Sequence, residues 1–73
     1  MPQYDIEHNM TNHPPKDEHV VRLFEDLRKS FKATAAEIVE LCPDSREKSL
    51  ALTNLEQALM WSTAAVARNQ EEI

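Results

Sequence analysis

The 73-residue sequence contains no glycine, one cysteine, one tryptophan, one tyrosine and two phenylalanines. Without glycine the chain lacks the residue that suits tight hairpin turns and phosphate-cradling loops, which argues against most β architecture and against loop-based nucleotide folds. A single cysteine excludes an intrachain disulfide and fits a reducing cytoplasm, where we expect the protein to act. No run of about 18 apolar residues is present, so we expect no membrane span. The polar, acidic N-terminal segment does not resemble a signal peptide.

The charge balance limits the kind of partner. Thirteen acidic residues against eight basic ones give a net charge of −5. The basic residues form no block of the kind that neutralises the phosphates of DNA or RNA. We therefore expect no polymeric nucleic acid as a partner. A small anionic ligand needs only a local basic pocket, so that class of ligand stays open.

Metal binding and catalysis find little support in the sequence. The three histidines and Cys42 lack the i, i+4 or CxxC spacing that structural metal sites use. The neighbouring carboxylates lie on expected helix surfaces and caps, with no nucleophile or histidine placed to act with them. A hydrolytic site also needs a cavity that excludes water, and a single hairpin offers none. We expect no metal, no cofactor and no enzymatic activity.

A seven-residue pattern of apolar side chains predicts the first long helix. Because it recurs in steps of three and four, it is typical of a helix that packs along one side, and we expect the helix to run from Asp17 to Leu41. Cys42 comes before Pro43, and a residue before proline is biased away from helical backbone, so the helix should end there. The stripe consists of Val20, Phe24, Leu27, Phe31, Thr34, Ile38 and Leu41.

A second helix should follow almost at once. Asp44 with Glu47 resembles a capping box, which predicts a helix from near Ser45 to Arg68 or Asn69. A connection this short makes the two helices antiparallel neighbours. The sequence therefore predicts an all-α fold: residues 1–13 form a flexible, irregular N-terminal arm, and residues 14–73 form an antiparallel helical hairpin.

The second helix is apolar on two sides, which predicts an oligomer. One stripe faces the first helix, and the other has no partner within the chain, although each apolar face needs a neighbour. A domain this small buries only about 60% of its unfolded surface, so association is the available route to stability. We expect a compact homo-oligomer with ligands at its subunit seams. The first stripe is Leu52, Leu55, Leu59, Ser62 and Val66, and the second is Ala51, Ala58 and Ala65 beside Leu50, Trp61 and Ala64.

Trp61 and the basic residues of the first helix have two readings each. Trp61 on an apolar helix face favours an interface anchor over a platform for a nucleobase. Arg28 and Ser30 flank the stripe of the first helix, where a side chain faces the next subunit. The basic residues of this helix then serve either in intersubunit ion pairs or in ligand contacts.

Most of the chain, from Asn12 to Asn69, resembles the helical-hairpin family of phage anti-defence proteins. The best-known members of this family are the second type of anti-CBASS protein, and a related hairpin occurs in a Thoeris anti-defence protein. The turn and the last helix carry the more specific part of the resemblance. The matching pieces are NHPP (Asn12–Pro15), CP-x-SRE-x-S (Cys42–Ser49), LT-x-LE (Leu52–Glu56) and the closing ALMW…AAVARN.

The resemblance implies a sponge, meaning a protein that sequesters cyclic oligonucleotide second messengers without cleaving them. Family members typically form hexamers with two kinds of pocket at subunit junctions. The dinucleotide pocket uses an aromatic residue, at the position of Asn12 here, and a basic residue that aligns with Arg28. The loss of an aromatic stacking surface is worth roughly 1–3 kcal/mol per base, and His13 or Tyr4 would have to replace it. The trinucleotide pocket uses polar and basic residues that align with His13, Ser30 and Arg68.

The leading hypothesis is a cyclic-oligonucleotide sponge whose ligands, cyclic di- or trinucleotides, bind at Asn12, His13, Arg28, Ser30 and Arg68. A helical oligomerisation or adaptor module that binds a protein partner is the alternative. An enzyme of nucleotide turnover is a weaker third hypothesis. Tight binding of unchanged ligand separates the first hypothesis from both of the others.

Overall fold

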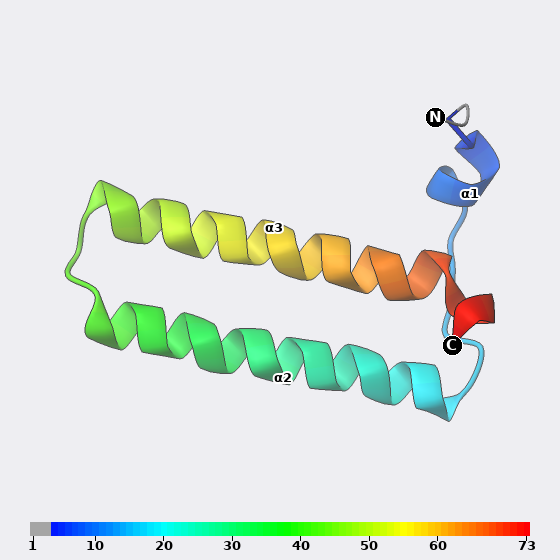
Figure 1. Cartoon of the computed structure of the whole chain (residues 1–73), viewed down its shortest axis with the longest axis horizontal. Coiled ribbons are helices and arrows are strands. Elements are labelled where there is room, and N and C mark those ends of the chain that lie inside the picture. The colour runs from blue at the N-terminus through cyan, green and yellow to red at the C-terminus, as the bar shows by residue number, and fades with distance from the viewer. Residues whose placement is uncertain (1–3) are drawn as a thin grey trace.

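The computed structural model describes residues 4–73, which form an antiparallel pair of long helices preceded by one short helix (Figure 1). The short helix α1 spans Ile6–Met10, α2 spans Glu18–Leu41, α3 spans Arg46–Arg68, and a 3-10 turn η1 follows at Gln70–Glu72. Residues 4–73 contain no β-strand, so the predicted all-α class and hairpin are confirmed. Within the same range, no helix is both long and apolar enough to cross a membrane.

The bounds of α2 follow from its caps. The side chain of Asp17 accepts a hydrogen bond from the backbone N–H of Val20 at 3.1 Å, which satisfies one of the unpaired donors of the first turn. At the other end Cys42 adopts extended backbone before Pro43, as the proline requires. The predicted range of the first helix is therefore confirmed to within one residue.

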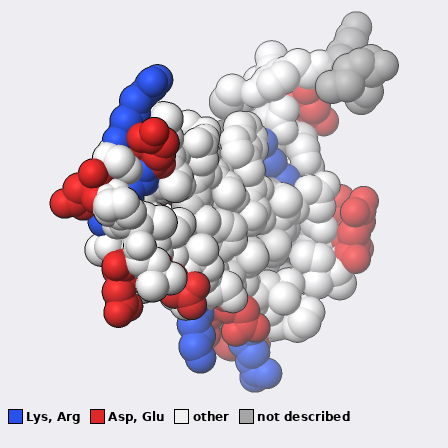
Figure 2. All heavy atoms as spheres, turned by 60° about the vertical axis from the view of Figure 1, so that its left-hand side comes forward, with Lys and Arg blue, Asp and Glu red and all other residues white. Residues whose placement is uncertain are grey.

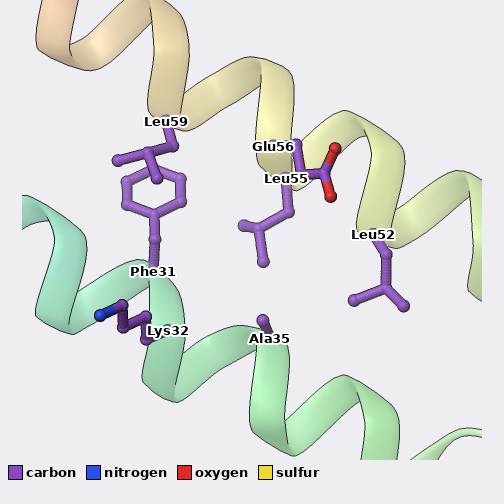
Figure 3. A pocket seen from close by; sticks show the side chains of 7 residues that line it. All are labelled: Phe31, Lys32, Ala35, Leu52, Leu55, Glu56 and Leu59. Carbon is purple, nitrogen blue, oxygen red and sulfur yellow. The ribbon is translucent and has the colours of Figure 1, made fainter.

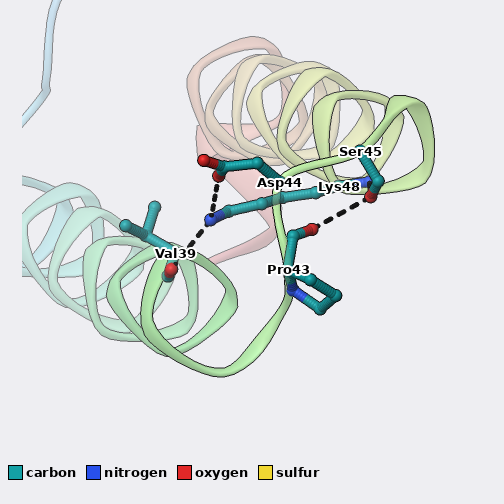
Figure 4. Close-up of polar contacts among 5 residues, drawn as sticks. All are labelled: Val39, Pro43, Asp44, Ser45 and Lys48. Carbon is teal, nitrogen blue, oxygen red and sulfur yellow. Dashed lines mark hydrogen bonds and ion pairs between the residues drawn. The ribbon is translucent and has the colours of Figure 1, made fainter.

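The start of α3 differs from the predicted capping box. Ser45, and not Asp44, is the N-cap: its Oγ accepts from the backbone N–H of Lys48 at 3.1 Å and donates to the carbonyl of Pro43 at 3.0 Å (Figure 4). Asp44 instead pairs with Lys48 Nζ at 2.9 Å. The prediction was wrong because Asp44 and Ser45 are adjacent and both are good caps, and the tight turn after Pro43 brings the second one into place.

The contact between α2 and α3 follows the predicted stripes with two exceptions. Thr34 is exposed, and its hydroxyl donates back to the carbonyl of Ser30, while Ala35 takes the half-buried position. Leu41 is 75% exposed. A straight helix has 3.6 residues per turn and drifts from a strict heptad, so the inward position moves from residue 34 to 35. All five predicted residues of the α3 stripe are half-buried against α2.

The second stripe of α3 is uncovered in the single chain. Its alanines 51, 58 and 65 are exposed, as are the large side chains of Leu50, Met60 and Trp61. Figure 2 shows a broad uncharged surface with the charged side chains gathered at its margins. Among the apolar side chains of residues 4–73, only Val20 is fully buried. The uncovered apolar face and the small core both favour association of several chains. The homo-oligomer stays a prediction.

The N-terminal segment is more regular than predicted. Where the sequence indicated an irregular arm, Asp5 caps the short helix α1 by accepting from the backbone N–H of His8 at 3.0 Å. This helix lies beside the C-terminal end of α3, on the side away from α2 (Figure 1). The first three residues of the predicted arm, Met1 to Gln3, lie outside the described range. The flexibility of the arm stays a prediction.

Candidate ligand-binding site

Arg68 lines two adjoining hollows at the C-terminal end of α3. The first, of about 250 Å³, is closed on one side by His8 and Asn9 of α1. The second, of about 530 Å³, extends along α3 past Gln57 and Met60. We call the two together the Arg68 hollow. Trp61, Ala64 and Arg68 line both of its parts.

The helix geometry explains why these side chains share a surface. Trp61 and Arg68 are seven residues apart, which is two helical turns on one face and about 10 Å along the axis. Between them Ala64 and Ala65 carry only methyl groups, so the surface is hollowed there. Trp61 is 68% exposed, and Arg68 is half-buried. The arrangement presents an aromatic surface and a guanidinium group in one hollow.

His13 joins this region through α1. Its Nε2 lies 2.6 Å from the carbonyl oxygen of His8, and the two imidazole rings meet edge to face with centroids 5.3 Å apart. A carbonyl only accepts, so Nε2 must donate, and the neutral ring then has only an acceptor at Nδ1. Nε2 of His13 is therefore engaged within the chain, and the role of His13 at a ligand site stays a prediction. Asn12, the preceding residue, is exposed.

Arg28 and Ser30 lie elsewhere in the single chain. Arg28 is exposed on α2, and its guanidinium carbon sits 5.6 Å from the centroid of the Phe24 ring, within cation–π range. Ser30 lines a separate hollow of about 270 Å³ with Val66 of α3 and Asp26. The structure thus brings His13 and Arg68 to one end of the hairpin through His8, and it places Ser30 in a different hollow from Arg68.

A further hollow lies midway along the hairpin, between α2 and α3 (Figure 3). Its volume is about 210 Å³, and Phe31, Leu55 and Leu59 make it apolar. One lysine, Lys32, and one glutamate, Glu56, line it together, so their charges offset each other. It contains no predicted site residue, and its chemistry does not suit a phosphate.

Two contributions to the Arg68 hollow were missed by the sequence reasoning. His8 and Asn9 belong to a helix that was not predicted, although Asp5 offered a cap signal in front of it. Trp61 was read as an interface anchor, although its seven-residue spacing from Arg68 places both on one face. Across residues 4–73, no group of three His, Cys, Asp or Glu side chains is placed to hold a metal ion.

The described residues thus form a two-helix hairpin with a hollow that contains one arginine and with a large uncovered apolar face. The family model described as Acb2/Tad1, hairpin domain, matches residues 1–67. The chain belongs to this family of anti-CBASS and anti-Thoeris sponges, so the predicted resemblance is confirmed. The family binds cyclic nucleotide ligands and acts as a sponge rather than as an enzyme. Comparisons with curated proteins and with solved structures gave no match.

The range that the family model matches contains four of the five predicted site residues. It includes Asn12, His13, Arg28 and Ser30, and it ends one residue before Arg68. The roles of all five residues stay predictions. The turn η1 lies wholly outside the matched range.

Proposed function

We propose that this protein sequesters a cyclic oligonucleotide second messenger at seams between its subunits and does not cleave it. The observation that carries the proposal is the family match over residues 1–67. Binding without chemistry needs only affinity, so no catalytic group is required. The protein acts in the cytoplasm, which is the host cytoplasm if a phage encodes it.

The Arg68 hollow supports this proposal chemically. A guanidinium group binds phosphate through two parallel, charge-assisted hydrogen bonds. The Trp61 ring in the same hollow offers an apolar surface of the kind on which a base stacks. A cyclic nucleotide carries few charges, so a single local arginine is compatible with a net charge of −5.

The proposed pocket is built from more than one copy of the chain. Ser30 and Arg68 line different hollows of the same chain, which supports a pocket that takes them from different subunits. The uncovered face of α3 provides the surface on which a second copy would sit. A closed, symmetric assembly such as a hexamer repeats this seam and gives several equivalent pockets.

The preferred ligand is a cyclic trinucleotide. The position that carries a stacking aromatic in the dinucleotide pocket of the family is Asn12 here, and this side chain is exposed. The set His13, Ser30 and Arg68 keeps a ring, a hydroxyl and a guanidinium group for the trinucleotide pocket. Arg28 remains for contact with a dinucleotide, but the dinucleotide pocket lacks the stacking surface that the family's aromatic residue provides.

A second candidate function is an adaptor that binds a protein partner. The exposed Met60 and Trp61 favour it, because exposed apolar patches of this kind mark protein interfaces. In this case Arg68 would serve in ion pairs, and no cyclic nucleotide would bind.

Calorimetry with a panel of cyclic di- and trinucleotides tests the proposal. We expect binding of a trinucleotide, and chromatography should recover the ligand intact. Arg68→Ala should weaken this binding about 10-fold or more, since it removes charge-assisted hydrogen bonds to phosphate. Arg46→Ala is the matched control, because it makes the same change at the other end of α3, where Arg46 is exposed.

The mass of the assembly, measured by analytical ultracentrifugation, should be the same for both variants and the unchanged protein. Lack of binding across the panel would exclude the sponge and favour the adaptor. Recovery of a linear or hydrolysed product would contradict sequestration. Equal loss in both variants would mean that net charge, and not the Arg68 hollow, controls binding.

A further inference from the structure

The segment just before α2 and the segment just after α3 are joined by hydrogen bonds centred on Gln70. Among the polar side chains of residues 4–73, Gln70 alone is buried, with 9% of its surface exposed. Its Oε1 accepts from the backbone N–H of Lys16 at 2.7 Å. Its Nε2 donates to the carbonyls of Pro14 and Ala67, both at 3.0 Å. Both N–H groups and the oxygen of the amide are engaged, so its burial leaves no polar atom unpaired.

Lys16 strengthens the same junction. Its Nζ donates to the backbone carbonyl of Gln70 at 2.8 Å and to that of Ile73 at 3.2 Å. Both carbonyls lie just past the end of α3, and the carbonyl of Gln70 also accepts from the backbone N–H of Ile73 at 3.1 Å. We call this set of contacts among Pro14, Lys16, Ala67, Gln70 and Ile73 the Gln70 clasp.

The two prolines make the position of His13 depend on the Gln70 clasp. The Pro14 carbonyl is fixed by Gln70, and His13 is the residue directly before Pro14. Both His13 and Pro14 precede a proline, which restricts their backbone to extended conformations, and the proline rings fix φ at the next two residues. The direction in which the chain leaves Lys16 towards His13 is therefore largely determined.

From His13 the contacts reach α1. The His13 ring donates to the carbonyl of His8, and His8 and Asn9 form one wall of the Arg68 hollow. A continuous series of contacts thus connects Gln70, beyond the end of α3, with the wall that faces Arg68. The helix α1 has only five residues, and so short a helix is not stable without such support.

We propose that Gln70 and Lys16 are positioning residues, which clamp residues 14–16 to the end of α3 and thereby hold His13 and α1 against the Arg68 hollow. The clasp itself needs no ligand. The consequence for ligand affinity rests on the proposed function. Gln70 and Ile73 lie outside the range that the family model matches, so family membership does not account for this device.

Hydrogen–deuterium exchange tests the clasp directly. Gln70→Met keeps a side chain of similar length and removes all three of its hydrogen bonds, and Lys16→Met removes the ammonium group. We expect the amides of Asn9 and Thr11, which donate within α1, to exchange about 10-fold faster or more in both variants. Amides in the middle of α2 and α3 should keep their rates.

Two variants serve as controls. Lys16→Arg keeps the charge and the donors and should restore slow exchange in α1. Lys29→Met makes the same change as Lys16→Met at an exposed position of α2 and should leave α1 unaffected. Unchanged exchange at Asn9 and Thr11 in Gln70→Met would overturn the clasp. Equal acceleration throughout α2 and α3 would also overturn it, because Gln70 would then only stabilise the whole fold.

Calorimetry with the trinucleotide tests the consequence. Gln70→Met and Lys16→Met should bind about fivefold to tenfold more weakly, whereas Lys16→Arg and the charge control Arg46→Ala should bind normally. Unchanged affinity together with fast exchange in α1 would show that the position of His13 does not serve binding, and would refute this step. If the unsubstituted protein binds no cyclic nucleotide, the proposed function fails, and the exchange data still decide the clasp.

Discussion

The hairpin is closed at both ends by a lysine that donates to backbone carbonyls. At the turn, Lys48 Nζ lies 2.9 Å from the carbonyl of Val39, near the end of α2 (Figure 4). At the terminal end, Lys16 Nζ lies 2.8 Å from the carbonyl of Gln70, just beyond α3. At the turn the cation stands at the negative pole of α2, whereas Lys16 binds carbonyls that lie past the last residue of α3. The partners are 9 residues apart at the turn and 54 apart at the termini.

The two ends differ in what surrounds the lysine. The terminal end holds the fully buried Val20 and the buried amide of Gln70. At the turn, Leu41 and the side chain of Asp44 are exposed, and the side chain of Lys48 is largely covered, with 13% of its surface exposed. A short connection loses little conformational entropy on closure, so exposed polar contacts suffice there. Joining two distant segments costs more entropy, and the terminal end offsets that cost by burial.

The largest difference between the two ends should appear in the free energy of unfolding when one valine at each end is replaced by alanine. Val20→Ala removes buried methyl groups at the terminal end and should lower the free energy of unfolding by about 2 kcal/mol. Val39→Ala, at an exposed position near the turn, should cost less than about 0.5 kcal/mol. Urea denaturation followed by circular dichroism measures both, at one matched subunit concentration because association adds to stability.

An equal cost for the two substitutions would contradict the comparison. It would mean that contacts outside the single chain cover Val39. A repeat at lower subunit concentration then separates the two sources of stability. The cost of losing an intrachain contact stays constant, whereas the cost of losing an intersubunit contact falls once dilution separates the assembly into folded subunits.

The turn end was largely predictable because its signals are local. The proline after Cys42 ended the first helix, and the apolar periodicity gave the inward residues of both long helices. Three errors remained, of which one is Leu41, predicted to face inward but exposed. Adjacent caps at Asp44 and Ser45 give equivalent local signals, and a strict heptad misplaces Thr34 because the helix period is 3.6. The contact of Lys48 with Val39 follows from the turn but was not predicted.

The terminal end was not predictable in the same way. Nothing near Gln70 in the sequence indicates that its amide reaches Pro14 and Lys16, because these partners are more than 50 residues away. The helix α1 has too few residues to show a periodicity. Arg68 and His13 were named as site residues through the family resemblance. The structure added their connection through His8, which neither spacing nor composition contains.

A smaller effect should identify the true cap at the turn. Ser45→Ala should lower the free energy of unfolding by about 1 kcal/mol, because the backbone N–H of Lys48 loses its acceptor. Asp44→Ala keeps that cap and should cost clearly less. Thermal unfolding of the two variants provides the measurement. The reverse order would restore the capping box of Asp44 with Glu47 and place the start of α3 one residue earlier.

The smallest expected effect is the pH dependence of the turn. The hydrogen bond from Lys48 and its positive charge hold the pKa of Asp44 below the ordinary value of an aspartate. In the unfolded chain this pKa returns to its ordinary value, so on acidification the unfolded state takes up the proton first. The stabilisation by Asp44 is therefore complete above the ordinary aspartate pKa, and it is lost as the pH falls through the lower, folded value.

The difference in unfolding free energy between the unsubstituted protein and Asp44→Asn isolates this contribution, because all other carboxylates cancel. It should be larger at about pH 7 than at about pH 2.5. The expected change is small, since both the carboxylate and its hydrogen bond face solvent, and about 1 M salt should reduce it further. In a Lys48→Met background, the difference in unfolding free energy between the proteins with and without Asp44→Asn should no longer depend on pH.

A pH dependence that persists in that background would show that another group sets the pKa of Asp44. Several groups, and not Lys48 alone, would then hold the turn. The turn end would in this respect resemble the terminal end, where several residues form the Gln70 clasp.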